Sequence, residues 1–349
     1  MNITDLMEKA AAMNASDLHI SVGIPPTVRI SSGLVSLGDT MVTPDISRAF
    51  AREVMDELQW NMFEQNGEFD FSLSVPGKYR FRENAYKQRQ SVALAMRLIR
   101  NNPPDLSSLG LPPVVHSLCS LNRGLILVTG PTGSGKSTTL AAMIDVINQT
   151  RNAHILTLED PIEYLHKHKK CIVNQREIGV DSQNYAAALR AAMRQDPDII
   201  LIGEMRDLET ISIALTAAET GHLVLSTLHT TGAAKTIDRV IDVFPPFQQQ
   251  QIRMQLSMTL VAVISQQLLL STDGKSRVPA VETLIATPAV RNLIRENKVH
   301  QVAGIMQAST SSGNQLMDNA LANLFRQGRI SREDALFYCI DKNYISTLL

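Results

Sequence analysis

Residues 124–138 form the run GLILVTGPTGSGKST, and the fold can be worked out from there. After Gly124, the first part is aliphatic or β-branched, which is typical of a strand buried on both faces of a parallel sheet. From Gly130 the run matches GxxxxGK[ST], and residues 139–148 continue as a helix-forming segment. Strand, glycine-rich loop and helix in this order predict a P-loop, whose backbone N–H groups surround phosphate oxygens. We therefore expect an α/β domain that binds a nucleotide.

The loop residues divide the predicted work of binding ATP and Mg²⁺. Lys136 brings a positive charge to the β- and γ-phosphate oxygens, and the Ser137 hydroxyl suits Mg²⁺, which prefers oxygen ligands. The predicted nucleotide-binding residues are Gly130, Pro131, Thr132, Gly133, Ser134, Gly135, Lys136, Ser137 and Thr138.

Two further apolar runs end in carboxylates. Residues 198–204, DIILIGE, place Glu204 at the carboxyl end of a predicted buried strand, where ligands of open α/β sheets bind. Residues 154–163, HILTLEDPIE, end in Glu159, Asp160 and Glu163. These four carboxylates, with Ser137, are the predicted Mg²⁺ ligands, although a polar turn that caps a strand would show the same pattern. Glu204 is the first choice to orient or deprotonate the attacking water, and Glu163 is the second.

A third apolar run carries a histidine at each end. Residues 220–230 read TGHLVLSTLHT, with His222 before the predicted strand and His229 after it. A polar end on a buried strand of a P-loop sheet is a usual place for a γ-phosphate sensor. We predict that His229 has this role and that His222 supports it, although a histidine is also often a satisfied core or surface residue. Metal binding by these histidines is disfavoured because Mg²⁺ prefers oxygen.

The N-terminal part predicts a separate, small α+β domain. Helical patterns cover residues 4–13 and 47–63, and strand patterns cover residues 68–75, 79–86 and 92–99. A proline-rich stretch then predicts an extended linker. The expected organisation is a domain of residues 1–100, a linker of residues 101–113 and an ATPase domain of residues 114–349.

Opposite charges are segregated within this N-terminal part. Residues 1–70 hold four basic and eleven acidic side chains, whereas residues 71–98 hold six basic side chains and one acidic one. Arg80 and Arg82 are two positions apart, so both lie on one face of a strand. With Arg97 they form either a solvated surface or a clamp for an anion. The net charge of −1 for the whole chain disfavours binding to nucleic acid through bulk charge.

Composition limits the remaining possibilities. The chain is 44% hydrophobic and has no apolar run of the roughly 18 residues that a membrane span needs. Its N-terminus carries Asp5, Glu8 and Lys9 and does not match a secretory signal, so we expect a cytoplasmic protein without membrane insertion. Cys119, Cys171 and Cys339 are widely spaced, and we expect reduced thiols in the core.

In their order, these motifs resemble those of the secretion ATPases that power type II secretion and type IV pili. Residues 130–138 are similar to the family's Walker A motif, residues 155–164 to its Asp box, residues 189–207 to its Walker B motif and residues 220–229 to its His box. The stretches SDLHI (residues 16–20) and AVRNLIRE (residues 289–296), together with the short chain, are most similar to the branch that retracts pili in twitching motility. Departures include YRFRENA (residues 79–85) for GRFRVN and Ser31-Ser32 for an acidic position.

The resemblance implies a homohexameric ring in which a PAS-like N-terminal domain precedes a RecA-like ATPase domain. It implies ATP hydrolysis that drives pilus retraction, at the cytoplasmic face of the inner membrane. The implied partners are a platform protein and, indirectly, pilin, and not nucleic acid. Arg80, Arg82 and Arg97 would then reach the phosphates, as arginine fingers do.

Three alternatives remain at this point. The chain could be a pilus assembly or type II secretion ATPase, which has the same core motifs. It could also be an interaction module that binds ATP without turnover, although Lys136, Ser137 and Glu204 together disfavour this. A DNA-translocating ring is disfavoured by the balanced charge.

Overall fold

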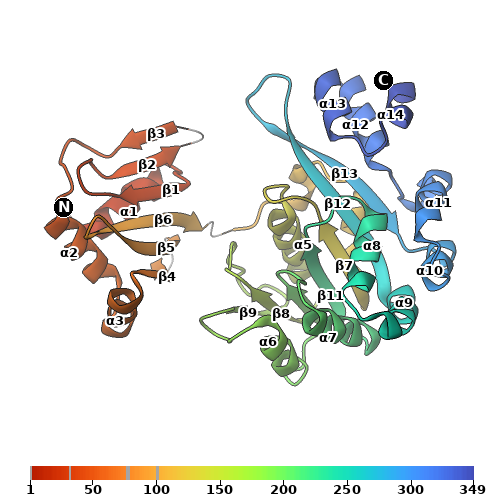
Figure 1. The fold of residues 1–349 in the computed structure, drawn as a ribbon, viewed down its shortest axis with the longest axis horizontal. Coiled ribbons are helices and arrows are strands. Elements are labelled where there is room, and N and C mark those ends of the chain that lie inside the picture. Colours follow the sequence, from red (N-terminus) through yellow and green to blue (C-terminus); the bar gives the residue numbers. More distant parts are fainter. Residues whose placement is uncertain (1, 31–32, 76–78, 100–101) are drawn as a thin grey trace. The chain divides into compact units, whose positions relative to one another are not determined.

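The computed structural model describes residues 2–30, 33–75, 79–99 and 102–349 (Figure 1). The chain divides into two compact units, Met1–Asn102 with Glu163–Leu165, and Pro103–Ile162 with His166–Leu349. Each unit has a hydrophobic core of its own. In the described part of the chain, no helix has the length and apolar character needed to cross a membrane.

The first unit is an antiparallel sheet with three helices, as expected of a small α+β domain. Its sheet has the strand order β3-β2-β1-β6-β5-β4. The elements are α1 (Ile3–Ala12), β1 (Asp17–Ile20), β2 (Thr27–Ile30), β3 (Gly33–Ser36), α2 (Pro44–Val54), α3 (Glu57–Asn66), β4 (Glu68–Val75), β5 (Tyr79–Gln88) and β6 (Ser91–Ile99). Positions 79, 81, 83 and 85 of β5 are buried and alternate with partly exposed ones, so one face of the strand lies on the core.

One helix prediction in this unit is wrong. The single helix expected over residues 47–63 is two helices, α2 and α3, which are interrupted at Met55 and Asp56. The Asp56 side chain accepts a hydrogen bond from the Gln59 N–H, and the Gln59 side chain accepts one from the Asp56 N–H. This capping box starts a new helix, because it satisfies backbone groups that a continuous helix would have bonded internally.

The second unit is built on a seven-stranded sheet with the order β13-β12-β7-β11-β10-β8-β9. Strands β12, β7, β11, β10, β8 and β9 are parallel to their neighbours, and β13 is antiparallel to β12. The strands are β7 (Gly124–Thr129), β8 (His154–Glu159), β9 (Ile172–Glu177), β10 (Ile199–Ile202), β11 (Leu223–Leu228), β12 (Leu260–Leu270) and β13 (Arg277–Ile285). The main helices around it are α5 (Lys136–Thr150), α6 (Tyr185–Ala192), α7 (Leu208–Glu219), α8 (Ala233–Asp242), α9 (Pro246–Thr259), α10 (Pro288–Arg295) and α11 (Val302–Ala308).

Parallel pairing puts the predicted motifs at one edge of this sheet. Strands β7, β11, β10 and β8 are neighbours, so their carboxyl ends lie side by side. Every residue of β7, β10 and β11 is buried, as expected for strands covered on both faces. The P-loop, Glu159, Glu204 and His229 lie at or just beyond these ends, and this edge therefore carries the candidate site.

The segment expected to be an extended linker is partly helical. Leu106–Leu109 form a 3-10 helix, and Leu106 is buried in a core that also contains Ile126 and Leu140. Helix α4 (Pro113–Leu118) follows directly, while residue 101 lies outside the described residues. The second proline pair starts a helix rather than prevents one, since Pro112 is the N-cap residue of α4 and proline is well tolerated at the first helical position, Pro113. The predicted limits of the two domains and of the linker stay a prediction.

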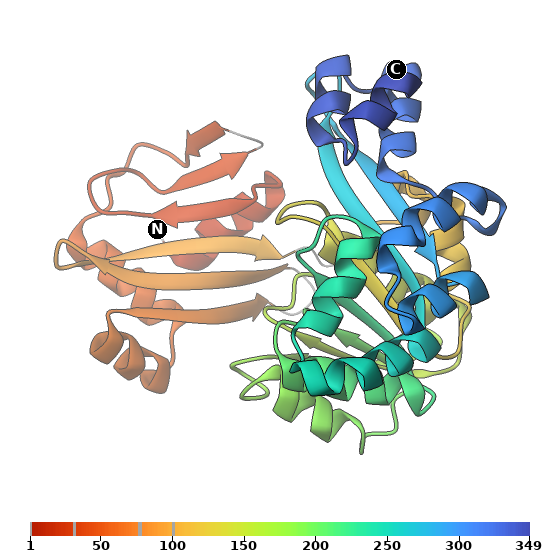
Figure 2. The same ribbon diagram turned by 45° about the vertical axis from the view of Figure 1, so that its right-hand side comes forward.

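The last three helices form what we term the C-terminal helical cluster: α12 (Met317–Arg326), α13 (Arg332–Tyr338) and α14 (Lys342–Leu348). Strands β12 and β13 are long and extend to this cluster (Figure 2). Leu269, Val278 and Ala280 from the two strands share a core with Met317 and Leu321 of α12. Elsewhere in the unit Cys119 and Cys171 are buried free thiols, as expected, and Cys339 is partly exposed.

Candidate active site

The P-loop needs glycine at defined positions. Gly130, Gly133 and Gly135 have φ angles of 136°, 79° and 90°, in the region that side-chain-bearing residues rarely adopt. A Cβ atom at Gly130 would lie 2.2 Å from the carbonyl oxygen of Gln266 on β12. The loop therefore passes so close to the neighbouring strand that only glycine fits there.

Helix α5 begins at Lys136, directly after the glycines of this loop. Its N-cap residue, Gly135, has no side chain to bond the first helical N–H groups. Such groups and the helix dipole favour an anion at this end of a helix. The Lys136 ammonium group donates to the carbonyl oxygens of Gly130 and Pro131, at 2.8 and 3.0 Å, and so lies back over the loop.

Three buried polar atoms close to the loop have no hydrogen-bond partner among the described residues: Thr129 Oγ1, Ser134 Oγ and Gln266 Oε1. The amide nitrogen of Gln266 donates to Thr139 Oγ1 at 2.9 Å. Buried polar atoms are normally hydrogen-bonded, and leaving them without a partner costs free energy. These unsatisfied atoms fit a site that takes up a polar group such as a hydrated phosphate.

Glu204 and His229 are brought together by the carboxyl ends of β10 and β11. The Glu204 carboxylate is mostly buried, and its Oε2 lies 3.5 Å from His229 Nε2. Its Oε1 accepts an ion-paired hydrogen bond from Arg206 Nε at 2.6 Å, and the pair with Glu204 raises the pKa of Arg206. Two predicted catalytic residues from separate motifs therefore form one group, with Arg206 as a third member.

The predicted acids of the Asp box lie in different surroundings. Glu159 Oε1 accepts hydrogen bonds from Thr157 Oγ1 at 2.6 Å and from Gln175 Nε2 at 3.0 Å. Asp160 is exposed and is joined to Pro161 by a cis peptide bond. Glu163 is also exposed and is grouped with the first unit, so its role as the water-activating base stays a prediction.

Tyr185 is a further candidate site residue, which sequence reasoning missed. Burial raises the pKa of Tyr185, and the charges of Asp160, Glu204 and Glu159 raise it further. A Cβ atom at Gly203, the residue before Glu204, would lie 2.7 Å from the Tyr185 hydroxyl oxygen, so the phenol lies close to the end of β10. It stays protonated there and can donate a hydrogen bond. It is the first residue of α6, in a run of alanines without a recognisable catalytic pattern, so no signal in the sequence pointed to it.

His222 is not part of this group. It precedes β11, and its Nδ1 lies 3.0 Å from the Ala217 carbonyl oxygen at the end of α7. His229 follows the other end of the strand, about 20 Å away at roughly 3.3 Å per residue. Within one chain, His222 therefore does not support His229, because β11 separates them.

The arginines of the first unit share one surface. Arg80 and Arg82 alternate with core-facing residues of β5, which confirms that they lie on one face, and Arg97 on β6 is the cross-strand partner of Arg82. Arg97 Nε also forms an ion pair with Asp17 Oδ1 at 3.0 Å. The basic strands thus partly neutralise acids from the acidic segment. The predicted contact of these arginines with phosphate stays a prediction.

The chemistry of the donors at the sheet edge fits Mg²⁺. Ser137, Glu159 and Glu204 offer oxygen atoms, which this ion prefers. The described residues contain no cluster of three or more His, Cys, Asp or Glu side chains that could hold a metal ion by themselves. This agrees with the usual binding of Mg²⁺ at nucleotide sites by one or two carboxylates together with the phosphates.

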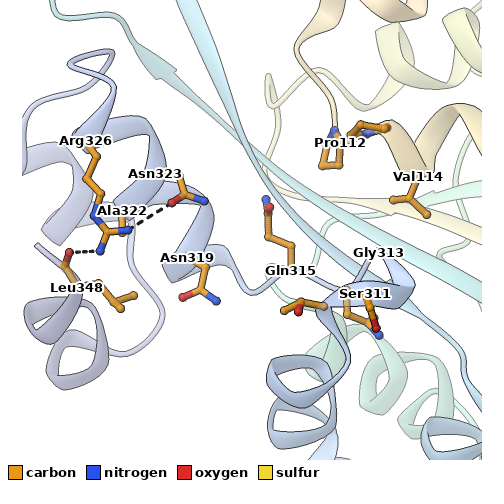
Figure 3. Close-up of a pocket in the computed structure, with 13 residues that line it drawn as sticks. Pro112, Val114, Ser311, Gly313, Gln315, Asn319, Ala322, Asn323, Arg326 and Leu348 are labelled. Atoms are coloured by element: carbon orange, nitrogen blue, oxygen red, sulfur yellow. Dashed lines mark hydrogen bonds between the residues drawn. The ribbon is translucent and has the colours of Figure 1, made fainter.

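A cavity of about 570 Å³ lies elsewhere in the second unit (Figure 3). Its lining comes from residues 112–114, residues 310, 311 and 313–315, helix α12 and Leu348, and it includes Asn319, Asn323 and Arg326. Arg326 is already bonded to the carbonyl oxygen of Leu348, at 2.7 Å. None of the predicted ATP-site residues is among its lining residues, so the cavity is distinct from the P-loop site.

The second unit has a RecA-like parallel sheet and a P-loop that depends on glycine. A carboxylate and a histidine lie together at the ends of two neighbouring strands, β10 and β11. These features define a P-loop ATPase. The first unit, an antiparallel sheet with helices, fits the small α+β domain that the sequence predicts before it.

Comparison with known proteins gives the particular family. Residues 2–317 match the family model "Type II/IV secretion system protein". The chain is 50% identical over 335 residues to the "Type IV pilus retractation ATPase PilT" of Pseudomonas aeruginosa, covering 96% of this chain and 97% of that one. It is 49% identical to a "Twitching motility protein" of Neisseria gonorrhoeae, over 89% of this chain and 83% of that one. A crystal structure of the pilus retraction motor PilT with bound ADP has a TM-score of 0.94, with 50% identity and 99% of each chain covered.

The chain therefore belongs to the type II/IV secretion system protein family. The expected ATPase activity, the RecA-like domain and the resemblance to the retraction branch are confirmed by these relatives.

Proposed function

We propose that this chain is an ATP-hydrolysing motor that retracts type IV pili and works as a homohexamer. The observation that carries the proposal is the Glu204–His229 pair at the sheet edge that also bears the P-loop. It occurs in a chain that is half identical, over nearly its whole length, to a pilus retraction ATPase. The proposed partners are an inner-membrane platform protein and, through it, pilin, at the cytoplasmic face of that membrane.

In the proposed mechanism, ATP binds with its phosphates on the backbone of residues 130–138. Lys136 moves from its own loop carbonyls to the γ-phosphate, since the ammonium group gains more from a charged oxygen. Ser137, Glu159 and Glu204 would hold Mg²⁺, which neutralises phosphate charge when bound. Catalysis then depends mainly on positioning and charge.

Glu204 is proposed to orient or deprotonate the attacking water, and Glu163 is the other candidate for this task. His229 reports the γ-phosphate to the rest of the sheet edge through its contact with Glu204. Arg80, Arg82 and Arg97 are proposed to approach the phosphates within the ring, where they would stabilise the negative charge of the transition state.

Steady-state phosphate release by the purified full chain tests the motor claim. Lys136→Ala and Glu204→Gln are each expected to lower kcat by about two orders of magnitude or more, because they remove charge stabilisation or the base. Glu209→Gln is a matched control, since this exposed glutamate on α7 pairs only with Arg190 in the described structure. If Glu204→Gln releases phosphate as fast as the control, Glu204 is not the base and Glu163→Gln becomes the variant to measure. Equal turnover by all three variants and the unchanged chain overturns the enzymatic proposal.

A deletion strain separates retraction from assembly, because an assembly ATPase has the same core motifs. Loss of a retraction motor leaves cells with excess surface pili and no twitching, and expression of the unchanged chain restores both. Cells that lose their pili on deletion would show an assembly ATPase instead. Sedimentation of the purified chain with and without ATP tests the ring, which is expected to have six times the mass of one chain.

A further inference from the structure

A buried acid on β13 holds the start of two helices. Glu282 is only 4% exposed, and its two carboxylate oxygens have different partners. Oε1 accepts a hydrogen bond from the N–H of Ala233 at 2.6 Å, and Oε2 accepts one from the N–H of Met317 at 3.1 Å. Ala233 is the first residue of α8, and Met317 is the first residue of α12.

The sequence around both helices explains why a distant carboxylate is needed. The N-cap positions of α8 and α12 are Gly232 and Leu316, which carry no polar side chain for the first N–H groups. Unbonded N–H groups at a helix start are costly when buried, and a negative charge there is favourable. Burial raises the pKa of Glu282 and the nearby Asp318 charge adds to this, whereas the two N–H donors oppose it. Each carboxylate oxygen of Glu282 therefore accepts a hydrogen bond from the first N–H group of one helix.

Glu282 belongs to a row of residues that crosses the sheet at the level of the active site. Its cross-strand partner on β12 is Ser265, whose own partner on β7 is Thr129, the residue before the P-loop. Thr129 in turn pairs with Leu228 on β11, the residue before His229. Strand pairing therefore places Ser265 and Glu282 level with both catalytic motifs.

Ser265 and Glu282 together hold the segment that follows His229. Ser265 Oγ accepts a hydrogen bond from the N–H of Gly232 at 2.9 Å, and Glu282 accepts from the next N–H, that of Ala233. Residues 230–233, which follow His229 and include the first residue of α8, are thus fixed at two consecutive amides by buried side chains. A Cβ at Gly232 would lie 3.7 Å from Glu282 Oε1 and 3.5 Å from Ile340, which lies between α13 and α14 of the C-terminal helical cluster.

We propose that Glu282 is a positioning residue, which sets His229 against Glu204 and links that contact to the C-terminal helical cluster. Because the two oxygens serve α8 and α12, a shift of the cluster changes the start of α8 and hence the place of His229. The inference rests on the proposed role of His229 in hydrolysis.

The first test compares kcat and KM for ATP in full-length variants. In Glu282→Gln the amide nitrogen cannot accept, so one helix start loses its bond, and kcat is expected to fall about ten-fold from misplacement of a catalytic group. The KM for ATP is expected to change by less than about two-fold, since the P-loop is untouched. Ser265→Ala removes the neighbouring bond to Gly232 and is expected to act in the same direction, which keeps the test valid if Glu282→Gln does not fold.

A control variant separates positioning from loss of stability. Asn148 is fully buried near the far end of α5 and accepts hydrogen bonds from the N–H groups of Lys169 and Cys171. Asn148→Ala is expected to lower the unfolding temperature as Glu282→Gln does, but to leave kcat unchanged. Equal kcat losses in the two variants at equal loss of stability would overturn the inference.

A double-mutant cycle tests the route through His229. After His229→Ala, Glu282→Gln is expected to have no further effect on kcat, because the residue that it positions is gone. The same fractional loss in both backgrounds would overturn the inference while leaving the proposed motor intact. If His229→Ala alone leaves kcat unchanged, the proposed role of His229 is wrong, and so is the inference that Glu282 positions it. Loss of turnover in Lys136→Ala would still support the proposed ATPase.

Discussion

Oε2 of Glu204 lies 3.5 Å from Nε2 of His229, although 25 residues separate the two in sequence and each comes from a different motif. Parallel pairing of β10 with β11 explains the contact, since both residues follow adjacent strand ends. Oε1 of the same carboxylate is held by Arg206 at 2.6 Å. The carboxylate is thus held on both sides by side chains of the protein, which reduces the reorganisation that catalysis requires.

His229→Gln and His229→Ala should therefore differ. Glutamine keeps a polar group near Glu204, while alanine removes it, so alanine should lower kcat about ten-fold or more and glutamine less. ATP binding should stay within about two-fold in both, because neither change touches the P-loop. Single-turnover kinetics and nucleotide titration measure the two quantities. Equal kcat in both variants and the unchanged chain would contradict a role for His229.

Gly130→Ala should disable the P-loop for a steric reason. The added Cβ would lie 2.2 Å from the backbone carbonyl of Gln266 and 2.7 Å from Ser134 Oγ, and the φ of 136° adds strain. Neither β12 nor the loop can move away cheaply, so we expect loss of ATP binding. Gly133→Ala is the control, because its Cβ would meet no atom within 4 Å and only the strain of a positive φ remains. A fluorescent ATP analogue measures binding, and equal affinity in the two variants would argue against the steric account.

Sequence patterns identified what depends on local order, namely the P-loop, the apolar strands that precede Glu159 and Glu204, and β4, β5 and β6 of the first unit. They did not identify features that depend on which end of a strand carries the site, or on the pairing of strands that are far apart in the sequence. His222 and His229 flank the same strand, β11, and the sequence pattern does not distinguish them. Only His229 follows the carboxyl end of the strand, where the P-loop edge lies. Tyr185 and Ser265 come from segments without a motif, and only the folded sheet brings them close to the P-loop edge.

The break between α2 and α3 was missed for a different reason. Apolar residues such as Phe50, Val54 and Trp60 continue through it, so hydrophobic spacing alone favours one long helix. Asp56 and Gln59 form the Asp-x-x-Gln pattern of a capping box, which indicates a helix start, but the hydrophobic periodicity favours a continuous helix through this position.

Asp56→Ala should destabilise the first unit by removing that signal. Loss of the N-cap is expected to cost about 1 kcal/mol, because the side chain bonds the Gln59 N–H at 2.8 Å. Asp56→Asn should recover most of this, since asparagine is an equally good N-cap. Chemical denaturation followed by the fluorescence of Trp60, the only tryptophan in the chain, measures the change. Similar losses in both variants would show that charge, and not capping, is what matters.

A buried acid in the first unit predicts an unusual dependence of stability on pH. Glu83 is fully buried on the core side of β5, between Phe71 and Met96 as cross-strand partners, at the position where the GRFRVN pattern has valine. Its carboxyl oxygens have no hydrogen-bond partner among the described residues, and burial raises its pKa from 4.5 to about 8. At pH values between these two, Glu83 therefore keeps its proton in the folded state and loses it in the unfolded state.

Stability should consequently fall as the pH rises through this window. Below pH 4.5 Glu83 is protonated in both the folded and the unfolded state. Between about pH 4.5 and 8 it is protonated only in the folded state, so the free energy of unfolding falls by about 1.4 kcal/mol per pH unit. Glu83→Gln should remove this slope, because glutamine does not titrate. Glu83→Val should remove it and also raise the unfolding temperature at neutral pH, because an apolar side chain fits this core. Unfolding temperatures from pH 5 to 8 measure both effects, and parallel slopes in all three proteins would mean that Glu83 is not the group that titrates.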